Sequence, residues 1–195
     1  MSGLDRQQKA ILDFWFADGL DTQRAAWFRR DEAFDEAIRK SFWTLPDQAR
    51  DGAFDHWLGT PEGSLALLLV LDQFPRNLFR GQERAFAYDP KAREAAREAV
   101  LTHRHDEALP PAARVFLYLP FEHSEALADQ DLSVSLFERL RDYPEHRAEG
   151  GSIDYALRHR DVIRRFGRFP HRNAILGRAS TAEEEAYLRE PGAGF

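Results

Sequence analysis

The chain has 195 residues, 43% of them hydrophobic, which suits one well-buried core. Lys and Arg total 27 against 33 for Asp and Glu, and the net charge of -6 makes a nucleic-acid partner unlikely, because such binders normally carry a basic field. Cysteine is absent from the sequence, which excludes disulfides, thiol catalysis and cysteine metal sites. We therefore expect a single domain over residues 1–195.

The amino-terminal stretch "MSGLDRQQKAILDFWF" carries charge early and lacks the long apolar region of a secretory signal. The longest strongly apolar run, residues 65–71, is far too short to cross a bilayer. These features predict a cytoplasmic protein with no membrane association.

In the first third of the chain, apolar residues recur at the three-to-four spacing of amphipathic helices. The first predicted helix runs from Leu4 and ends near Gly19. The pattern continues through one or two helices over residues 27–43, and Pro46 then breaks it. The alternation with a period of two that predicts half-buried strands is rare in this sequence.

The middle of the chain contains the two most apolar predicted helices. Thr60, Pro61 and Glu62 form a helix start with a cap, a first-turn proline and a first-turn acid. Residues 65–71 are apolar on all sides, which predicts a central helix surrounded by others. A second apolar run, residues 115–119, lies in a helix that starts at Pro110-Pro111.

Two prolines in this region predict further boundaries. Asp89-Pro90 repeats the start signal of a cap followed by a first-turn proline. Pro120 lacks a backbone donor and is expected to kink or end the helix that contains residues 115–119.

The last third of the chain predicts three more helices. One covers residues 129–143, and another covers residues 152–166 with Gly167 as a left-handed cap. Ser180 and Glu183 predict a capping box that begins the final helix. With no fixed-period consensus and no linker, the pattern predicts an all-α domain of about ten antiparallel helices.

Polar residues follow directly on both apolar runs. The run over residues 65–71 continues into Asp72, Gln73, Arg76 and Asn77, and the run over residues 115–119 continues into Glu122, His123 and Glu125. Since the helices are predicted to be central, these groups are delivered near the core, where an uncompensated charge is costly. They are therefore expected to be paired or to serve a ligand.

The segment "FGRFPHRNAILGR", residues 166–178, repeats the Phe-Pro and Arg-Asn of "LDQFPRNLFRG", residues 71–81. We expect the two Arg-Asn motifs to meet in space. On the preceding helix, His159 and Arg160 fall between the apolar positions. Residues 158–178 hold seven arginines and two histidines against one acid, a local positive field that suits an anion, either a ligand or nearby carboxylates.

Each of these groups also has a structural interpretation. Asp72 and Arg76, four residues apart, are spaced for a local ion pair at a helix end. Residues 122–125 suit a solvated helix start after Pro120, where the helix dipole favours acids. His159 is consistent with a satisfied core histidine.

The arginine motif is open to the same two interpretations. Arg168, Arg172 and Asn173 suit helix capping and hydrogen bonds between helices as well as ligand contact. A buried polar network that fixes the register of the helices would explain all of the candidates together.

Standard catalytic motifs are missing from the sequence. It contains no phosphate-binding loop, no Gly-x-Ser-x-Gly elbow, no His-Glu-x-x-His and no Glu-x-x-His pairs. His103 and His105 lie in a polar stretch that does not predict a metal site by itself. We expect neither a metal nor a cofactor.

Three long motifs resemble those of the bacterial family grouped as domain of unknown function 924: "LDQFPRNLFRG" with "AFAYD", "FLYLPFEHSE", and "HRDVIRRFGRFPHRNAILGRAST". The resemblance covers nearly the whole chain. It implies an all-α, tetratricopeptide-like fold with a right-handed, solenoid-type arrangement of helices. It implies no particular activity, substrate or cofactor.

Two functions are consistent with the sequence. The first is a small-molecule binding protein or enzyme with a cleft that holds an anionic ligand. Its ligand-binding residues would be Asp72, Gln73, Arg76, Asn77, Arg168, His171, Arg172 and Asn173, and its candidate catalytic residues His123, His159, Glu122 and Glu125. The second is a tetratricopeptide-like scaffold for a protein partner, in which the same motifs brace the helices. Whether the protein is an enzyme is left open, and contact with RNA is the weakest alternative.

Overall fold

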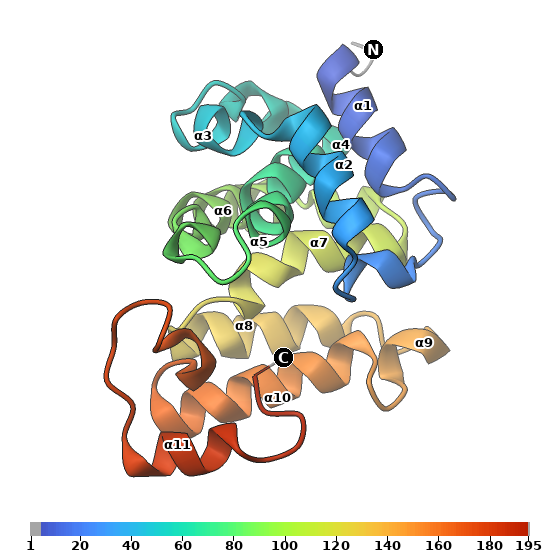
Figure 1. Ribbon diagram of the computed structural model, residues 1–195. Helices are drawn as coiled ribbons and strands as arrows, with labels where there is room; N and C mark the ends of the chain where they lie inside the picture. The colour runs from blue at the N-terminus through green and yellow to red at the C-terminus, as the bar shows by residue number, and fades with distance from the viewer. Residues whose placement is uncertain (1–4, 195) are drawn as a thin grey trace. The chain divides into compact units, whose positions relative to one another are not determined.

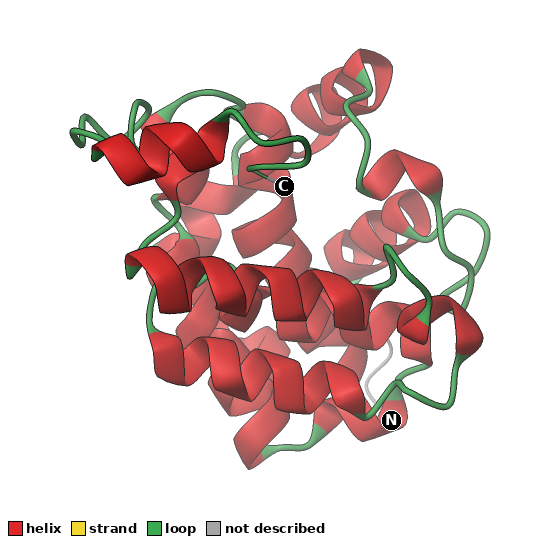
Figure 2. Ribbon diagram, turned by 90° about the horizontal axis from the view of Figure 1, so that it is seen from below, coloured by secondary structure: helices red, strands yellow, loops and turns green. Residues whose placement is uncertain are grey.

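The computed structural model describes residues 5–194, and every regular element in this range is a helix (Figures 1 and 2). The predicted all-α class is therefore confirmed. The count of about ten antiparallel helices and the tetratricopeptide-like arrangement stay predictions. The chain divides into two compact units, and the single domain also stays a prediction. Unit 1 comprises Met1–Arg80 and Arg84–Pro120, and unit 2 comprises Gly81–Glu83 and Phe121–Phe195.

Unit 1 contains helices α1 to α6 and most of α7. Their bounds are α1 Arg6–Trp15, α2 Glu32–Phe42, α3 Leu45–Arg50, α4 Pro61–Leu68, α5 Phe74–Leu78, α6 Asp89–Arg97 and α7 Pro111–Glu122. Short 3-10 segments lie at η1 Ala25–Trp27, η2 Asp55–Gly59, η4 Glu83–Phe86 and η6 His105–Ala108, and π-helical segments at η3 Leu69–Gln73 and η5 Glu98–Thr102. Helix α4 packs against α1 and α6.

The predicted central helix is confirmed, because every residue from Leu65 to Leu71 is fully buried. Thr60 caps α4 as predicted, its hydroxyl accepting the N–H of Gly63. Helix α4 continues through η3 into α5, and the N–H of Phe74 donates to the carbonyl of Leu69, five residues back. This wider π-helical turn directly precedes Pro75, whose ring would clash with the preceding carbonyls in a regular α-helix.

Three boundaries in unit 1 differ from the predictions. Helix α1 begins at Arg6, capped by Asp5, and ends at Trp15 and not near Gly19; the predicted start at Leu4 lies outside the described residues. Asp89 is the first residue of α6 and not its cap, because its carboxylate accepts hydrogen bonds from Arg76. Of the two outcomes expected at Pro120, the end of the helix does not occur, since α7 continues to Glu122, and a kink stays a prediction.

Unit 2 is built on two long helices, α8 (Leu127–Glu138) and α10 (Ser152–Phe166), which lie side by side (Figure 1). Its shorter elements are α9 (Pro144–Arg147), η7 (Pro170–Arg172) and α11 (Ala182–Leu188). Helix α10 has the predicted bounds, and Gly167 ends it with the predicted left-handed φ of 70°.

Two predictions for unit 2 are wrong in detail. Helix α8 starts and ends earlier than the predicted residues 129–143. The capping box of α11 uses Thr181 and Glu184, one residue after the predicted Ser180 and Glu183. Ser180 is instead engaged by Asn173, whose side-chain amide donates to its hydroxyl over 3.1 Å.

Within residues 5–194, no helix combines the length and the apolar character that crossing a membrane requires.

Candidate functional site

The predicted site residues divide between the two units. Unit 1 contains Asp72, Gln73, Arg76 and Asn77, and unit 2 contains Glu122, His123, Glu125, His159, Arg168, His171, Arg172 and Asn173. Each Arg-Asn motif forms contacts inside its own unit, described below. That the two motifs meet in one cleft stays a prediction.

In unit 1, Arg76 joins two buried carboxylates. Its Nη1 lies 3.2 Å from Asp72 Oδ1 and 3.0 Å from Asp89 Oδ1, and its Nη2 lies 3.2 Å from Asp89 Oδ2. Burial opposes the charge of Arg76, but Asp72 and Asp89 more than offset this and raise its pKa. The ion pair suggested by the four-residue spacing is therefore present, and Asp89 extends it to α6.

The neighbouring residues of this motif also have partners in unit 1. Gln73 Nε2 donates to Asp72 Oδ2 over 2.6 Å, and Asn77 Nδ2 donates to Asp35 Oδ1 over 2.7 Å. Asp35 lies on α2 and also accepts from Arg80 Nη2 over 3.0 Å. In unit 1 the motif thus ties α5 to α2 and α6.

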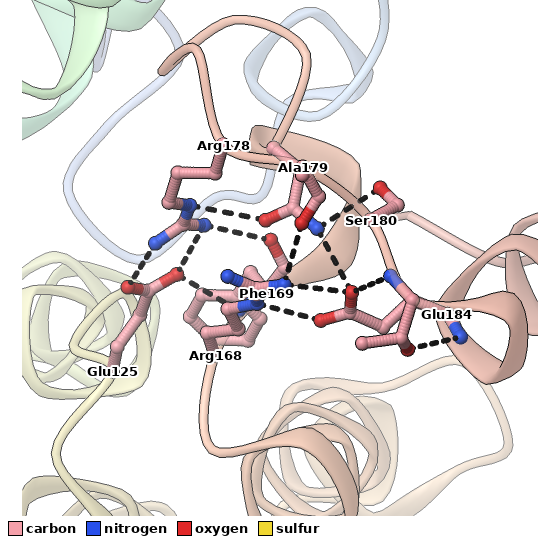
Figure 3. Close-up of polar contacts among 9 residues, drawn as sticks. Glu125, Arg168, Phe169, Arg178, Ala179, Ser180 and Glu184 are labelled. Carbon is pink, nitrogen blue, oxygen red and sulfur yellow. Dashed lines mark hydrogen bonds and ion pairs between the residues drawn. The ribbon is translucent and has the colours of Figure 1, made fainter.

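In unit 2, Glu125 and Arg178 close the segment that follows α10 (Figure 3). Arg178 Nη1 and Nη2 donate to the two carboxylate oxygens of Glu125 over 2.8 and 2.9 Å. The backbone N–H of Phe169 donates to Glu125 Oε1 over 2.8 Å, and Arg178 Nη2 donates to the Phe169 carbonyl over 3.1 Å. We call this arrangement the Glu125–Arg178 clasp.

Glu184 fixes the other side of the same segment (Figure 3). Arg168 Nε and Nη2 donate to its carboxylate over 2.6 and 2.8 Å, and Asn173 Nδ2 donates to it over 3.2 Å. Glu184 is only 2% exposed and also accepts the N–H of Thr181. The hydrogen bonds from Arg168 are the main reason that its pKa falls to about 2.

Glu122 and Glu125 do not form the solvated helix start that was one interpretation of the sequence. Glu122 is 4% exposed and lies in the last turn of α7, and Glu125 precedes α8, held in the clasp. Burial opposes the charge of Glu125, but Arg178 and the Phe169 N–H lower its pKa. Glu122 is therefore buried in unit 2, and Glu125 is half-buried there.

Two histidines and an arginine contact the fully buried ring of Phe169, and a third histidine lies beside one of them. The ring centroid of His159 lies 5.6 Å from that of Phe169 and 6.3 Å from that of His123. The ring of His171 lies 5.5 Å from Phe169, and the guanidinium of Arg172 stacks over Phe169 at 4.6 Å. We call His123, His159, Phe169, His171 and Arg172 the Phe169 cluster.

The surroundings of the Phe169 cluster disfavour protonation of His159 and His171. Burial, followed by the charge of Arg172, lowers the pKa of His171 to about 4. Burial and His123 lower the pKa of His159 well below its ordinary value, although its Nδ1 lies 2.9 Å from the Tyr155 carbonyl. Glu122 Oε1 is 3.5 Å from that same Nδ1. At neutral pH, His159 and His171 are therefore neutral imidazoles beside a cation.

The positive field predicted for residues 158–178 is compensated by acids outside that window. Arg164 pairs with Asp131 of α8, and Arg165 pairs with Glu183 of α11. Arg168 and Arg178 pair with Glu184 and Glu125, as described above. Glu184 is not among the site residues predicted from the sequence, although a capping box shifted by one position contains it.

The described histidines and acids do not gather as a metal site would. Within residues 5–194, no group of three or more His, Asp or Glu side chains is placed to hold a metal ion. His103 stacks on His105, and His105 Nδ1 lies 2.9 Å from the hydroxyl of Ser64.

Comparison with known proteins places the chain in a family. Residues 11–192 match the family described as "Bacterial protein of unknown function (DUF924)". A solved structure of the protein of unknown function ATU0120 from Agrobacterium tumefaciens is 43% identical, with a TM-score of 0.83 over 93% of this chain and 96% of that one. Among curated proteins the comparison gives no match. Given a match that spans almost all of its length, the chain belongs to the bacterial DUF924 family.

Proposed function

We propose that the protein binds a small anionic molecule at the Phe169 cluster of unit 2, with Arg172 as the anchor of the anion. The observation that supports this most is the gathering of His159, His171 and Arg172 around the ring of Phe169, with His123 beside His159. A guanidinium provides forked hydrogen bonds to carboxylate or phosphate oxygens, and stacking on Phe169 holds its plane in place.

Electrostatics give the site a preference for negative charge. Arg168 and Arg178 hold the segment that contains Arg172 through Glu184 and Glu125. A bound anion would offset the repulsion between Arg172 and protonated His171, so it would raise the pKa of His171. Binding is then coupled to proton uptake, and affinity rises as the pH falls through the pKa that His171 has in the complex.

Should the protein be an enzyme, proton transfer is the chemistry that these groups offer. His159 is buried next to Glu122, with His123 beside it. An imidazole that is neutral at pH 7 accepts a proton from a bound molecule, and a neighbouring carboxylate stabilises the imidazolium that forms. We assign this role to His159 or His123. In the same proposal, Arg168 and Asn173 support the segment and do not touch the ligand.

The test is calorimetric titration of the protein with inorganic phosphate and with succinate, each in two buffers of different ionisation enthalpy. We expect binding with uptake of a proton for at least one of the two anions. Arg172→Gln should weaken that binding by about tenfold or more, because charge-assisted hydrogen bonds are lost. Arg164→Gln is the control, since Arg164 is half-exposed on α10 and pairs with Asp131.

Two results together overturn the proposal. Arg172→Gln fails to fold, and neither anion binds to the unaltered protein. A thermal-shift screen against a metabolite library extends the same test to other anions. Ligands that stabilise the unaltered protein but not Arg172→Gln would identify the class of molecule.

The alternative is a tetratricopeptide-like, solenoid-type scaffold that binds a protein partner. The all-helical architecture and the side-by-side pair α8 and α10 favour it. Under this alternative, a stoichiometric protein partner is recovered, and its binding survives both Arg172→Gln and His159→Ala.

A further inference from the structure

The carboxy-terminal segment of unit 2 lies against one histidine of the Phe169 cluster. A methyl group added to Gly194 would stand 3.0 Å from His171 Cβ and 3.6 Å from His171 Cγ. Gly194 has a φ of 89°, in the region that favours glycine. The backbone of this segment therefore reaches the histidine at a distance that a larger residue would not allow.

The segment is held there by α11 and by a turn. The backbone N–H of Gly194 donates to the hydroxyl of Tyr187, and Ala193 N–H donates to the Glu190 carbonyl over 3.2 Å. The ring of Tyr187 packs against that of Phe166, with centroids 5.1 Å apart, beside the core formed by Val162, Ile163 and Phe169. The chain thus turns back after α11 onto the same core that supports the Phe169 cluster (Figure 1).

We propose that residues 190–194 are a cover over His171 that opens to admit the anion and closes to keep the imidazole away from water. This inference rests on the proposed function of the Phe169 cluster. It adds to that proposal a way to regulate the access of the anion to the cluster.

The contacts of the cover suit a segment that opens. Pro191 and Gly192 are exposed, and Gly192, with a φ of 78°, offers a turn that only glycine adopts readily. A neutral hydrogen bond to Tyr187 is a weak tether, and segments with few buried contacts open most readily in native proteins. The groups that act on His171 from the rest of unit 2 are Arg172, Glu125, His123 and Arg178, and none of them lies in residues 190–194.

The experiment compares the full chain with a chain that ends at Glu190 and with Tyr187→Phe, which removes only the hydroxyl. Glu185→Gln, an exposed change on α11, is the control. The modification rate of His171 by diethylpyrocarbonate is measured by mass spectrometry, with the exposed His56 as an internal reference. The His171 pKa is measured by NMR, and phosphate binding by stopped-flow fluorescence.

For the shortened chain, we expect His171 to be modified about tenfold faster, as for a site that is closed most of the time in the full chain. Its pKa should rise from about 4 toward its ordinary value of 6.5, and phosphate should associate faster. Tyr187→Phe should shift all three quantities in the same direction by less.

Two other outcomes separate this inference from the proposed function. If His171 is modified at the same rate and keeps its pKa in both variants, the cover is wrong, whether or not phosphate binds. If His171 becomes accessible but phosphate binds neither the full nor the shortened chain, residues 190–194 do cover the histidine and the anion site is wrong.

Discussion

Glu125 and Arg178, 53 residues apart in the chain, form a two-point ion pair whose oxygen–nitrogen distances are 2.8 and 2.9 Å. The carboxylate also accepts the N–H of Phe169, so that one side chain just before α8 fixes both ends of the segment that follows α10. His171 and Arg172 lie within this closed segment. Their position next to Phe169 thus depends on a contact that neither of them makes.

Breaking the Glu125–Arg178 clasp should destabilise the protein more than the loss of an ordinary surface ion pair would. For Glu125→Gln we expect a loss of about 2 kcal/mol in the free energy of unfolding, because the amide cannot accept both N–H groups of Arg178. Urea denaturation followed by circular dichroism measures it. The matched control is Glu138→Gln, since Glu138 pairs with Arg141 in a similar two-point geometry at the surface and should lose less than about 1 kcal/mol. Equal losses for the two variants would show that the clasp has no special role.

The Glu184 carboxylate is expected to stabilise α11 and the segment before it. Glu184→Ala removes the capping box and the partner of Arg168, for an expected loss of about 2 to 3 kcal/mol. Glu183→Ala, next to it but exposed and paired only with Arg165, should cost less than about 1 kcal/mol. Thermal unfolding of the two variants gives the comparison, and a smaller loss for Glu184→Ala than for Glu183→Ala would contradict the structure.

The neutral histidines predict a loss of stability in mild acid. The pKa of His171 is about 4 in the folded protein against 6.5 ordinarily, so the unfolded chain binds a proton that the folded chain does not. The contribution of neutral His171 to the free energy of unfolding is fully present above pH 6.5. It declines as the pH falls to about 4, by at most about 3 kcal/mol. His159 acts in the same direction. Urea midpoints measured from pH 7 to pH 4 test this.

The variant His171→Asn, which carries no titrating group, is the check on that assignment. Its free energy of unfolding should fall less steeply between pH 6.5 and 4 than that of the unaltered protein, because the contribution of His171 to the pH dependence is removed. An identical slope in the two proteins would mean that other groups cause the acid sensitivity.

Gly63 on α4 is a position where a single methyl group should be disruptive. A Cβ there would lie 2.3 Å from the carbonyl oxygen of Trp57 and 2.8 Å from the hydroxyl of Thr60, the cap of the same helix. Since backbone must move to relieve this overlap, Gly63→Ala should cost about 3 kcal/mol or more. At Gly59 the added methyl meets nothing within 4 Å, so Gly59→Ala should be close to neutral. Chemical denaturation of both variants decides, and a mild effect at Gly63 would contradict the packing of α4 on η2.

Much of the helix pattern could be predicted because it depends on neighbouring residues. Thr60-Pro61-Glu62 start a helix through a side-chain cap and a preset φ, and Gly167 ends one through its freedom at positive φ. The all-apolar run of residues 65–71 could be placed in the core because no solvent-facing side exists on it. The same local rule failed at Asp89, where the carboxylate binds Arg76 and does not cap its helix.

The candidate site was predictable only as a list of polar residues near apolar helices. The sequence identified His123, His159, His171 and Arg172 by their position after or within apolar segments. The structure brings the last three to Phe169 and places His123 beside His159. Apart from the pair of Asp72 with Arg76, the sequence did not predict which acids pair with the arginines. Glu184, Asp131 and Asp35 each lie far along the chain from the arginine they meet.

The sequence by itself therefore determined the helical class, the central helix and the residue types of the site, since helix periodicity and caps act over a few residues. Only the tertiary structure decided which charges are paired. Glu125 closes on Arg178, Glu184 on Arg168, and Gly194 on His171, because an ion pair or a backbone contact forms wherever folding brings the partners together, at any distance along the chain.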